Sequence, residues 1–422
     1  MVKLFLVLAG FFMSSELVWS MAASGLLKSI LGANYAFAQP QCIFLVTIII
    51  FYFRIAGLHV KNGLCSVCAA FLSVGLYEYF TTYLGDGHRG YAFQQFIFGF
   101  LYPVLLVLTL AGMTAERRLL FLRWFYIGYC AYLLVALFLL FVVDDIFIRQ
   151  FDSYGLGGAL ISLRYQELDK NLFLLVLGNA NKQSNYLIMG ILLGPYLIGI
   201  EGEEKGWTNR DLVIFRLFVM LATLVLLVLF SRAAMFLLPI ALYLNRRHLF
   251  MVSRRSLFLC LAGIVLLSIK FFDVFAVMAN YLLFGEYLDD IPQGFLGTFH
   301  QRTDQWSEIG PLLSDQAVFL HGLGVGTYGL LRAGSEHAGT HNLFLDHLLA
   351  SGLYGVIVLI TIVATGTILS LIKRDLRLIV GYIFFVTLSF REYSFSYLYV
   401  TSMGGLFFML LAFLTFDGSL KK

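Results

Sequence analysis

One short stretch, residues 339–355, combines an ionisable side chain with a hydrophobic run: GTHNLFLDHLLASGLYG. His341 and Asn342 open it, nine mostly apolar residues follow, and Gly352 and Gly355 come after them. Because imidazole titrates near neutral pH, His341 could take a proton from an incoming hydroxyl group. The alternative is that the His-Asn pair caps the start of a helix. Helix geometry alone favours neither interpretation.

Arginines are the second set of side chains that could do chemistry here. An arginine is always charged and binds phosphate through two parallel hydrogen bonds. Several around one pocket could hold a lipid diphosphate and stabilise it as a leaving group. The candidates are far apart in the chain: Arg149, Arg164, Arg232, Arg302 and Arg391. Each could instead anchor a helix end at lipid headgroups, although Arg232, inside VLLVLFSRAAMFLLP, needs a partner or a water-filled cavity.

The composition decides which kind of element must position these residues. Hydrophobic residues make up 60% of the 422-residue chain and charged residues only 13%, whereas a soluble domain has about 25% charged residues. The apolar runs repeatedly reach the ~20 residues needed to cross a bilayer. We therefore expect an all-α polytopic membrane protein.

About twelve transmembrane helices are predicted. Their ranges are 4–23, 39–57, 64–84, 92–113, 118–143, 171–200, 212–230, 232–245, 256–283, 341–372, 376–390 and 395–416. With both termini cytoplasmic, eighteen of the 29 Lys and Arg residues face the cytoplasm, as the distribution of positive charge in loops requires. One long helix over 212–245 would put NRRHLFMVSRR outside. We predict instead a tight hairpin with Ser231 and Arg232 at its apex.

The same alternation divides a single membrane domain, 1–422, into three parts. Spans 1 to 5 fall in 1–143, a first long external loop covers 144–170, and the remaining spans fall in 171–416. A second long external loop, 284–340, precedes the tenth span. Because the five arginines and His341 then share the external side, they could converge on one membrane face.

Several polar or small residues inside the spans call for an interpretation. The GNANKQSNY island, which includes Asn181, should face a cavity or bond to other helices. Glu16, Glu78 and Asp273 are embedded acids that could serve a proton pathway or pair with a neighbouring helix. On a regular helix His341, Gly352 and Gly355 share one stripe, so the glycines would let a neighbouring helix approach. GLGVG, 322–326, is interpreted as a turn.

The order of these features resembles that of the bacterial O-antigen ligases and O-antigen polymerases. GNANKQSNYL, LFSRAAMFLLPIALYL, QRTDQW and GLGVGTYG follow one another along the chain. A ligase-like signature comes next: His, then Asn, nine residues, Gly, two residues and Gly, at 341, 342, 352 and 355. Arg391 precedes the final span. The resemblance covers roughly 170–410.

The resemblance implies a GT-C-type glycosyltransferase of the bacterial inner membrane that works without metal or cofactor. Its donor would be a glycan on undecaprenyl diphosphate, and its acceptor the lipid A core or a second lipid-linked repeat unit. Arg232 and Arg302 would hold the diphosphate and His341 would be the general base. Other binding residues would be Arg149, Arg164, Arg391, Asn342 and Asn181, with structural roles for Gly352 and Gly355.

Ligase and polymerase are not separated by the sequence, although the complete His motif favours a ligase. A twelve-span transporter or lipid flippase is the alternative of another class. A transporter should have binding sites at mid-membrane, broken helices and two related halves, and the sequence shows no such internal symmetry. It also contains no nucleic-acid-binding module.

Overall fold

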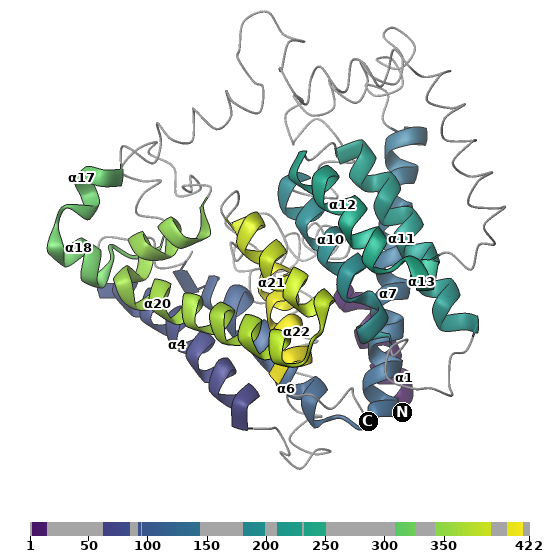
Figure 1. The fold of residues 1–422 in the computed structure, drawn as a ribbon, viewed down its shortest axis with the longest axis horizontal. Coiled ribbons are helices and arrows are strands. Elements are labelled where there is room, and N and C mark those ends of the chain that lie inside the picture. The colour runs from purple at the N-terminus through teal and green to yellow at the C-terminus, as the bar shows by residue number, and fades with distance from the viewer. Residues whose placement is uncertain are drawn as a thin grey trace, which may run out of the picture.

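The computed structural model describes residues 2–14, 62–84, 92–93, 95–143, 180–198, 209–229, 232–249, 309–325, 342–389 and 403–416. Every regular element in these ranges is a helix (Figure 1). Among them, four helices are long and apolar enough to cross a membrane, at 62–84, 115–142, 210–229 and 343–372. Their length and composition are those of a helical membrane protein. The predicted spans 39–57 and 256–283 lie outside the described residues.

The described helices follow the predicted hydrophobic runs closely. They are α1 Val2–Ser14, α4 Asn62–Leu84, η2 Phe96–Leu101, α6 Tyr102–Gly112, α7 Ala115–Phe138, η3 Leu139–Val143, α10 Ala180–Leu197, α11 Asn209–Leu229, α12 Arg232–Leu244, α13 Arg246–Leu249, α17 Ile309–Leu313, α18 Gln316–His321, α20 Leu343–Ile372, α21 Leu376–Ser389 and α22 Met403–Phe416. The π-helix η2 passes into α6 at Pro103, which suits a first helical turn because it has no N–H to leave unpaired.

The predicted reversal between the two apolar runs is confirmed, with Arg232 at the start of α12, while Ser231 lies outside the described residues. α11 ends at Leu229 and α12 begins at Arg232. Arg216 Nε, sixteen residues before Arg232, donates to the carbonyl of His248, sixteen residues after it, at 3.0 Å. A chain that continued in one direction could not bring these two positions together, so the chain reverses between α11 and α12. Both helices pack against α10.

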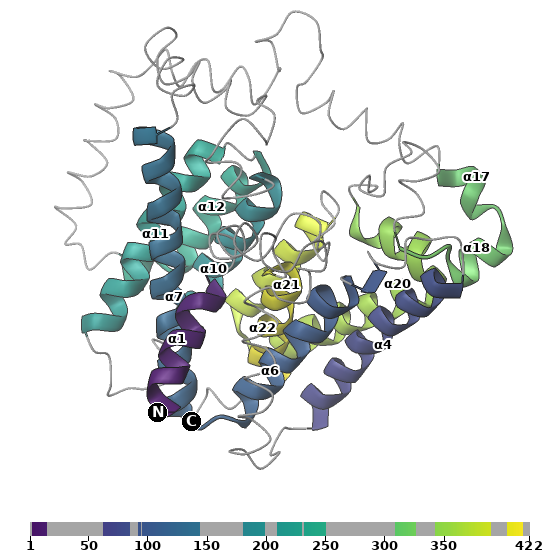
Figure 2. The same ribbon diagram turned by 180° about the vertical axis from the view of Figure 1, so that it is seen from behind.

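The relative directions of the helices agree with the expected alternation. Tyr126 Oη in α7 donates to the carbonyl of Gly190 in α10 at 2.9 Å. Further along α7, Tyr129 accepts a hydrogen bond from Gln183, earlier in α10, at 3.1 Å. α7 and α10 are therefore antiparallel, as consecutive spans must be. In the view from behind, α1 lies along α7 (Figure 2).

The described cations gather at one end of the helices, which we call the cationic end. There the Arg118 guanidinium lies 5.3 Å from the centre of the Phe413 ring, and Arg377 donates to the carbonyl of Leu244 at 3.1 Å. Its Lys and Arg residues are Lys3, Arg117, Arg118, Arg123, Arg210, Arg216, Arg246, Arg247, Lys373, Arg374 and Arg377. Among the described helices, only the Lys182 and Arg232 positions lie outside this set. α12 and α20 both begin away from this end, since Leu244, the last residue of α12, accepts from Arg377, and Lys373, which follows α20, donates to the carbonyl of Thr415.

Candidate functional site

The helix that follows the His-Asn pair is broken. α20 runs from Leu343 to Ile372, but Gly352 has φ 62° and ψ −159°, outside the helical region. A positive φ of this kind is one that glycine adopts readily. The expectation of one regular helix carrying a stripe of His341, Gly352 and Gly355 is therefore wrong. We call residues 343–351, before the break, the outer segment of α20.

Residues from the predicted second external loop, 284–340, bond to the helix at the break. The N–H of Leu323 donates to the carbonyl of Leu349 at 2.6 Å, and the N–H of Gly324 donates to the carbonyl of Ala350 at 3.1 Å. These carbonyls have no regular helical partner because the hydrogen-bond ladder is interrupted at Gly352. Irregular backbone at membrane depth is tolerated only where such groups are satisfied. Residues 322–325, the docking loop, meet this requirement.

Glycine is needed at two positions of the docking loop. Gly322 and Gly324 have φ values of 78° and 93°. A Cβ on Gly324 would lie 2.8 Å from the Cα of Thr82, and one on Gly322 would lie 2.6 Å from the carbonyl carbon of Ala350. GLGVG is thus more than the turn expected from its sequence, because its first glycines dock against α4 and α20.

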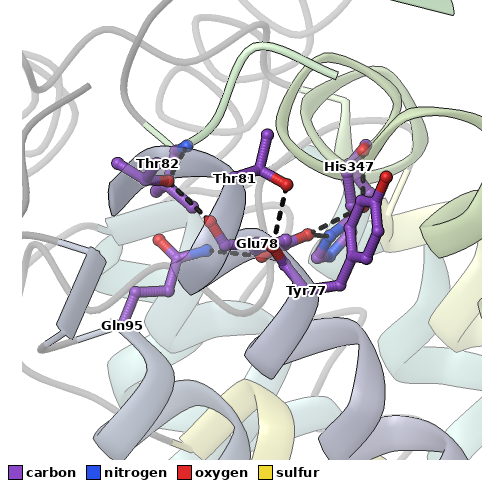
Figure 3. A network of polar contacts seen from close by, with 8 residues as sticks. Tyr77, Glu78, Thr81, Thr82, Gln95 and His347 are labelled. Atoms are coloured by element: carbon purple, nitrogen blue, oxygen red, sulfur yellow. Dashed lines mark hydrogen bonds and ion pairs between the residues drawn. The ribbon is translucent and has the colours of Figure 1, made fainter. Parts of the chain in front are cut away.

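A buried acid–base pair lies beside the docking loop. Glu78 in α4 and His347 in the outer segment of α20 contact each other through Glu78 Oε1 and His347 Nδ1. Their side chains are 1% and 0% exposed. Ser351 Oγ lies 3.2 Å from Glu78 Oε1, and Gln95 Nε2 donates to Glu78 Oε2 at 3.4 Å. Figure 3 shows the Glu78 carboxylate between Gln95 on one side and His347 on the other.

The contacts around Glu78 show that one of its carboxyl oxygens is an acceptor. The amide nitrogen of Gln95 can only donate, so Glu78 Oε2 accepts. An ionised carboxylate accepts at both oxygens, and it then requires a proton on Nδ1 of His347. A carboxylate held on one ring nitrogen fixes the tautomer and the orientation of the imidazole. An ionised Glu78 would therefore orient the His347 ring.

The same carboxylate residue connects the pair to the docking loop. Thr82 Oγ1 donates to the carbonyl of Glu78 at 2.6 Å and accepts from the N–H of Val325 at 2.7 Å. On the other side, the Phe100 ring meets the His347 ring edge-on, with centroids 6.0 Å apart. α4, α20, η2 and the docking loop thus meet at one buried polar cluster, which consists of Glu78, Thr82, Gln95, His347 and Ser351.

Asn342 is the N-cap residue of α20. Its side-chain oxygen accepts from the N–H groups of Phe344 and Leu345 at 3.0 and 3.3 Å, and the residue is 4% exposed. The capping interpretation of the His-Asn pair is therefore confirmed for Asn342. Whether Asn342 also binds substrate stays a prediction.

The other predicted site residues are described only in part. Arg232 begins α12 and Asn181 lies in the first turn of α10, but the structure describes only their backbone. Five more predicted site residues lie outside the described part of the chain: Arg149, Arg164, Arg302, His341 and Arg391. α12 and α20 both start away from the cationic end.

The polar island in the sixth predicted span bonds to a neighbouring helix. Gln183, Ser184 and Asn185 are all buried, and Gln183 donates to Tyr129 Oη in α7. Of the two predictions for this island, a cavity or bonds to other helices, the second is confirmed for Gln183.

Sequence reasoning did not single out His347, and it left Glu78 without an identified partner. A usable signal was present, because Glu78 lies six residues before the end of the predicted span 64–84 and His347 lies six residues after the start of 341–372. Ionisable residues at equal depth in two spans are natural partners. The expectation that Glu78 pairs with a neighbouring helix is confirmed.

No protein-family model matches the chain, and no curated protein shows a significant sequence match to it.

Proposed function

We propose that this chain is a membrane glycosyltransferase that moves a glycan from undecaprenyl diphosphate to a sugar hydroxyl on the periplasmic side of the bacterial inner membrane. The acceptor of a ligase is the lipid A core, and the His341 motif favours this form. The alternative within the class is a polymerase, whose acceptor is another lipid-linked repeat unit.

One observation supports the proposal most: α12, which begins at Arg232, and α20, which is capped at Asn342, both start away from the cationic end. Cations concentrate on the cytoplasmic side of membrane proteins. A guanidinium at the start of α12 and an imidazole next to Asn342 would then work in the same, periplasmic, leaflet.

In the proposed reaction, Arg232 and Arg302 bind the diphosphate and stabilise the charge that develops on it as it leaves. His341 accepts the proton that the acceptor hydroxyl loses when its oxygen bonds to the anomeric carbon. Arg391 and an arginine of the first external loop, Arg149 or Arg164, add positive charge around the diphosphate.

The direct test uses the purified protein in lipid nanodiscs with an undecaprenyl-diphosphate-linked glycan. Formation of glycosylated lipid A core supports a ligase, whereas elongation of the lipid-linked glycan supports a polymerase. Substitution of Ala for His341 should lower the rate about 100-fold or more, as loss of a general base does. Substitution of Lys for Arg232 should also lower it, because Lys lacks the bidentate fork. No transfer to either acceptor by the wild-type protein would refute the proposal.

A proton-coupled transporter is the second candidate, and two described features favour it. Glu78 and His347 form an intramembrane acid–base pair, which is a common element of proton pathways. The break at Gly352 interrupts an apolar helix of 30 residues, as in the discontinuous helices of transporters. Proteoliposomes that contain a pH-sensitive dye separate the two functions. Substrate-driven proton flux that is lost in Glu78→Gln would favour transport.

A further inference from the structure

The outer segment of α20 is held in place by its side contacts rather than by the rest of the helix. It spans nine residues between the cap at Asn342 and the break at Gly352, about 13 Å of helix. The backbone hydrogen bonds that would fix its direction relative to 353–372 are interrupted at the break. The direction of the outer segment therefore depends on its contacts with neighbouring elements.

Three of the described contacts of this segment bear on its direction. The docking loop bonds to its last carbonyls, at Leu349 and Ala350. Leu349 also packs in a small apolar cluster with Ile309 of α17. The third contact is the bond between His347 and Glu78 of α4, which is fully buried. Of the three, this is the contact that joins the outer segment to α4 through two buried side chains, so it fixes the direction of the segment against that helix.

We propose that Glu78 and His347 are positioning residues of the transfer reaction. They fix the direction of the outer segment against α4, and thereby the place of the helix start at Asn342. This inference rests on the proposed glycosyltransferase function. Neither side chain is exposed, so both act through the segment that they hold and not by contact with substrate.

The physical reason for such a pair is geometry rather than stability. A buried ion pair is often no more stabilising than apolar side chains of the same volume, but it is strongly directional. In catalysis a displacement of about 1 Å at the reacting groups can lower the rate about 100-fold. The start of α20 is separated from the rest of the helix by the break at Gly352. One directional contact with a fixed partner would therefore keep any reacting group near that start in place.

The experiment compares three substitutions of His347 in nanodiscs, with kcat and KM for the diphosphate-linked donor as the measurement. Asn keeps an amide N–H where Nδ1 stands and can still donate to Glu78. Gln instead carries its amide further out, where Nε2 stands, and Ala has no donor. We expect His347→Ala and His347→Gln to lower kcat about 100-fold, with KM nearly unchanged. We expect His347→Asn to stay within about tenfold of wild type, at every pH tested.

Tyr196→Phe is the matched control. It removes another buried side-chain bond between helices, from Tyr196 Oη to Asp375 Oδ1 at 2.5 Å, but at the cationic end. If the role of His347 were structural only, Tyr196→Phe and His347→Ala would reduce the melting temperature and the activity in the same proportion. We expect both variants to lose thermal stability and only His347→Ala to lose kcat.

Two results would overturn the positioning role alone. One is a normal kcat in His347→Ala while the wild-type protein transfers glycan. The other is His347→Asn as inactive as His347→Ala, because the reaction would then need the imidazole itself. A wild-type protein that transfers no glycan would overturn the proposed function and this role together.

Discussion

One ion pair at the cationic end and one acid–base pair at the other end differ greatly in burial. At the cationic end, Lys3 and Glu116 lie 3.4 Å apart with their side chains 80% and 82% exposed. At the other end, Glu78 and His347 pair with 1% and 0% exposure. A glutamate is therefore paired with a basic side chain at the surface in one case and in the protein interior in the other.

The difference in burial changes what each pair can do. An exposed pair contributes about 0–1 kcal/mol, because water competes for both charges and salt screens them. A buried pair cannot exchange its partner for water, so loss of one member leaves a charge or a polar group unsatisfied. The exposed pair is consequently tolerant of substitution, whereas the buried cluster is constrained to one arrangement.

Glu78→Ala should have the largest effect on stability. It removes the acceptor of His347, Ser351 and Gln95 at once, and breaking a buried pair in this way costs about 3–5 kcal/mol. The measurement is the apparent free energy of unfolding in mixed detergent micelles as SDS is titrated. Glu116→Ala, which removes an exposed carboxylate, is the control. A loss below about 1 kcal/mol in Glu78→Ala would show that the pair contributes no more than a surface contact.

Gly352→Ala should have the next largest effect. The residue has φ 62°, and an added Cβ would lie 2.6 Å from the backbone nitrogen of His321. Backbone strain of this kind costs about 1–3 kcal/mol, and the docking loop must also move. Gly310→Ala is the matched control, because nothing lies within 4 Å of an added Cβ there. Equal stability of the two variants in the same SDS titration would mean that the break is not fixed by close packing.

Features set by local sequence could be predicted, as the hairpin at Arg232 shows. Two apolar runs flank a Ser-Arg pair, and the basic stretch that follows must lie on the same side as the basic stretch before them. Both signals lie within about one helix length of the turn. The structure has the reversal at this position, with Arg216 against His248.

The buried cluster could not be predicted in the same way, because it depends on distant parts of the chain. Glu78 and His347 are 269 residues apart. Glycine within an apolar run is compatible with a regular helix, so the sequence around Gly352 gives no sign of the break. The break is stabilised by Leu323 and Gly324, which come almost thirty residues earlier. Only the packing of α4, α18 and α20 brings these pieces together.

Arg123→Lys tests a pair of intermediate burial. Arg123 contacts Asp211 through two nitrogens, each 2.6 Å from a carboxylate oxygen, with side-chain exposures of 29% and 7%. Lys keeps the charge but cannot make both contacts. We expect a loss of about 1–2 kcal/mol, between the buried and the exposed pairs, since bonds to charged groups contribute about 1.5–3 kcal/mol. A loss as large as that of Glu78→Ala would contradict the dependence on burial.

Lys3→Ala should have the smallest effect, and its dependence on salt is more informative than its size. The Lys3–Glu116 pair is almost fully exposed, so its loss should cost no more than about 0.5 kcal/mol at low ionic strength. The effect should vanish near 1 M salt, where the screening length is about 3 Å. The cost of Glu78→Ala should change little over the same range, because ions do not reach a buried pair. Thermal unfolding of both variants at low and high salt measures the contrast. An equal response to salt in the two variants would mean that water reaches Glu78.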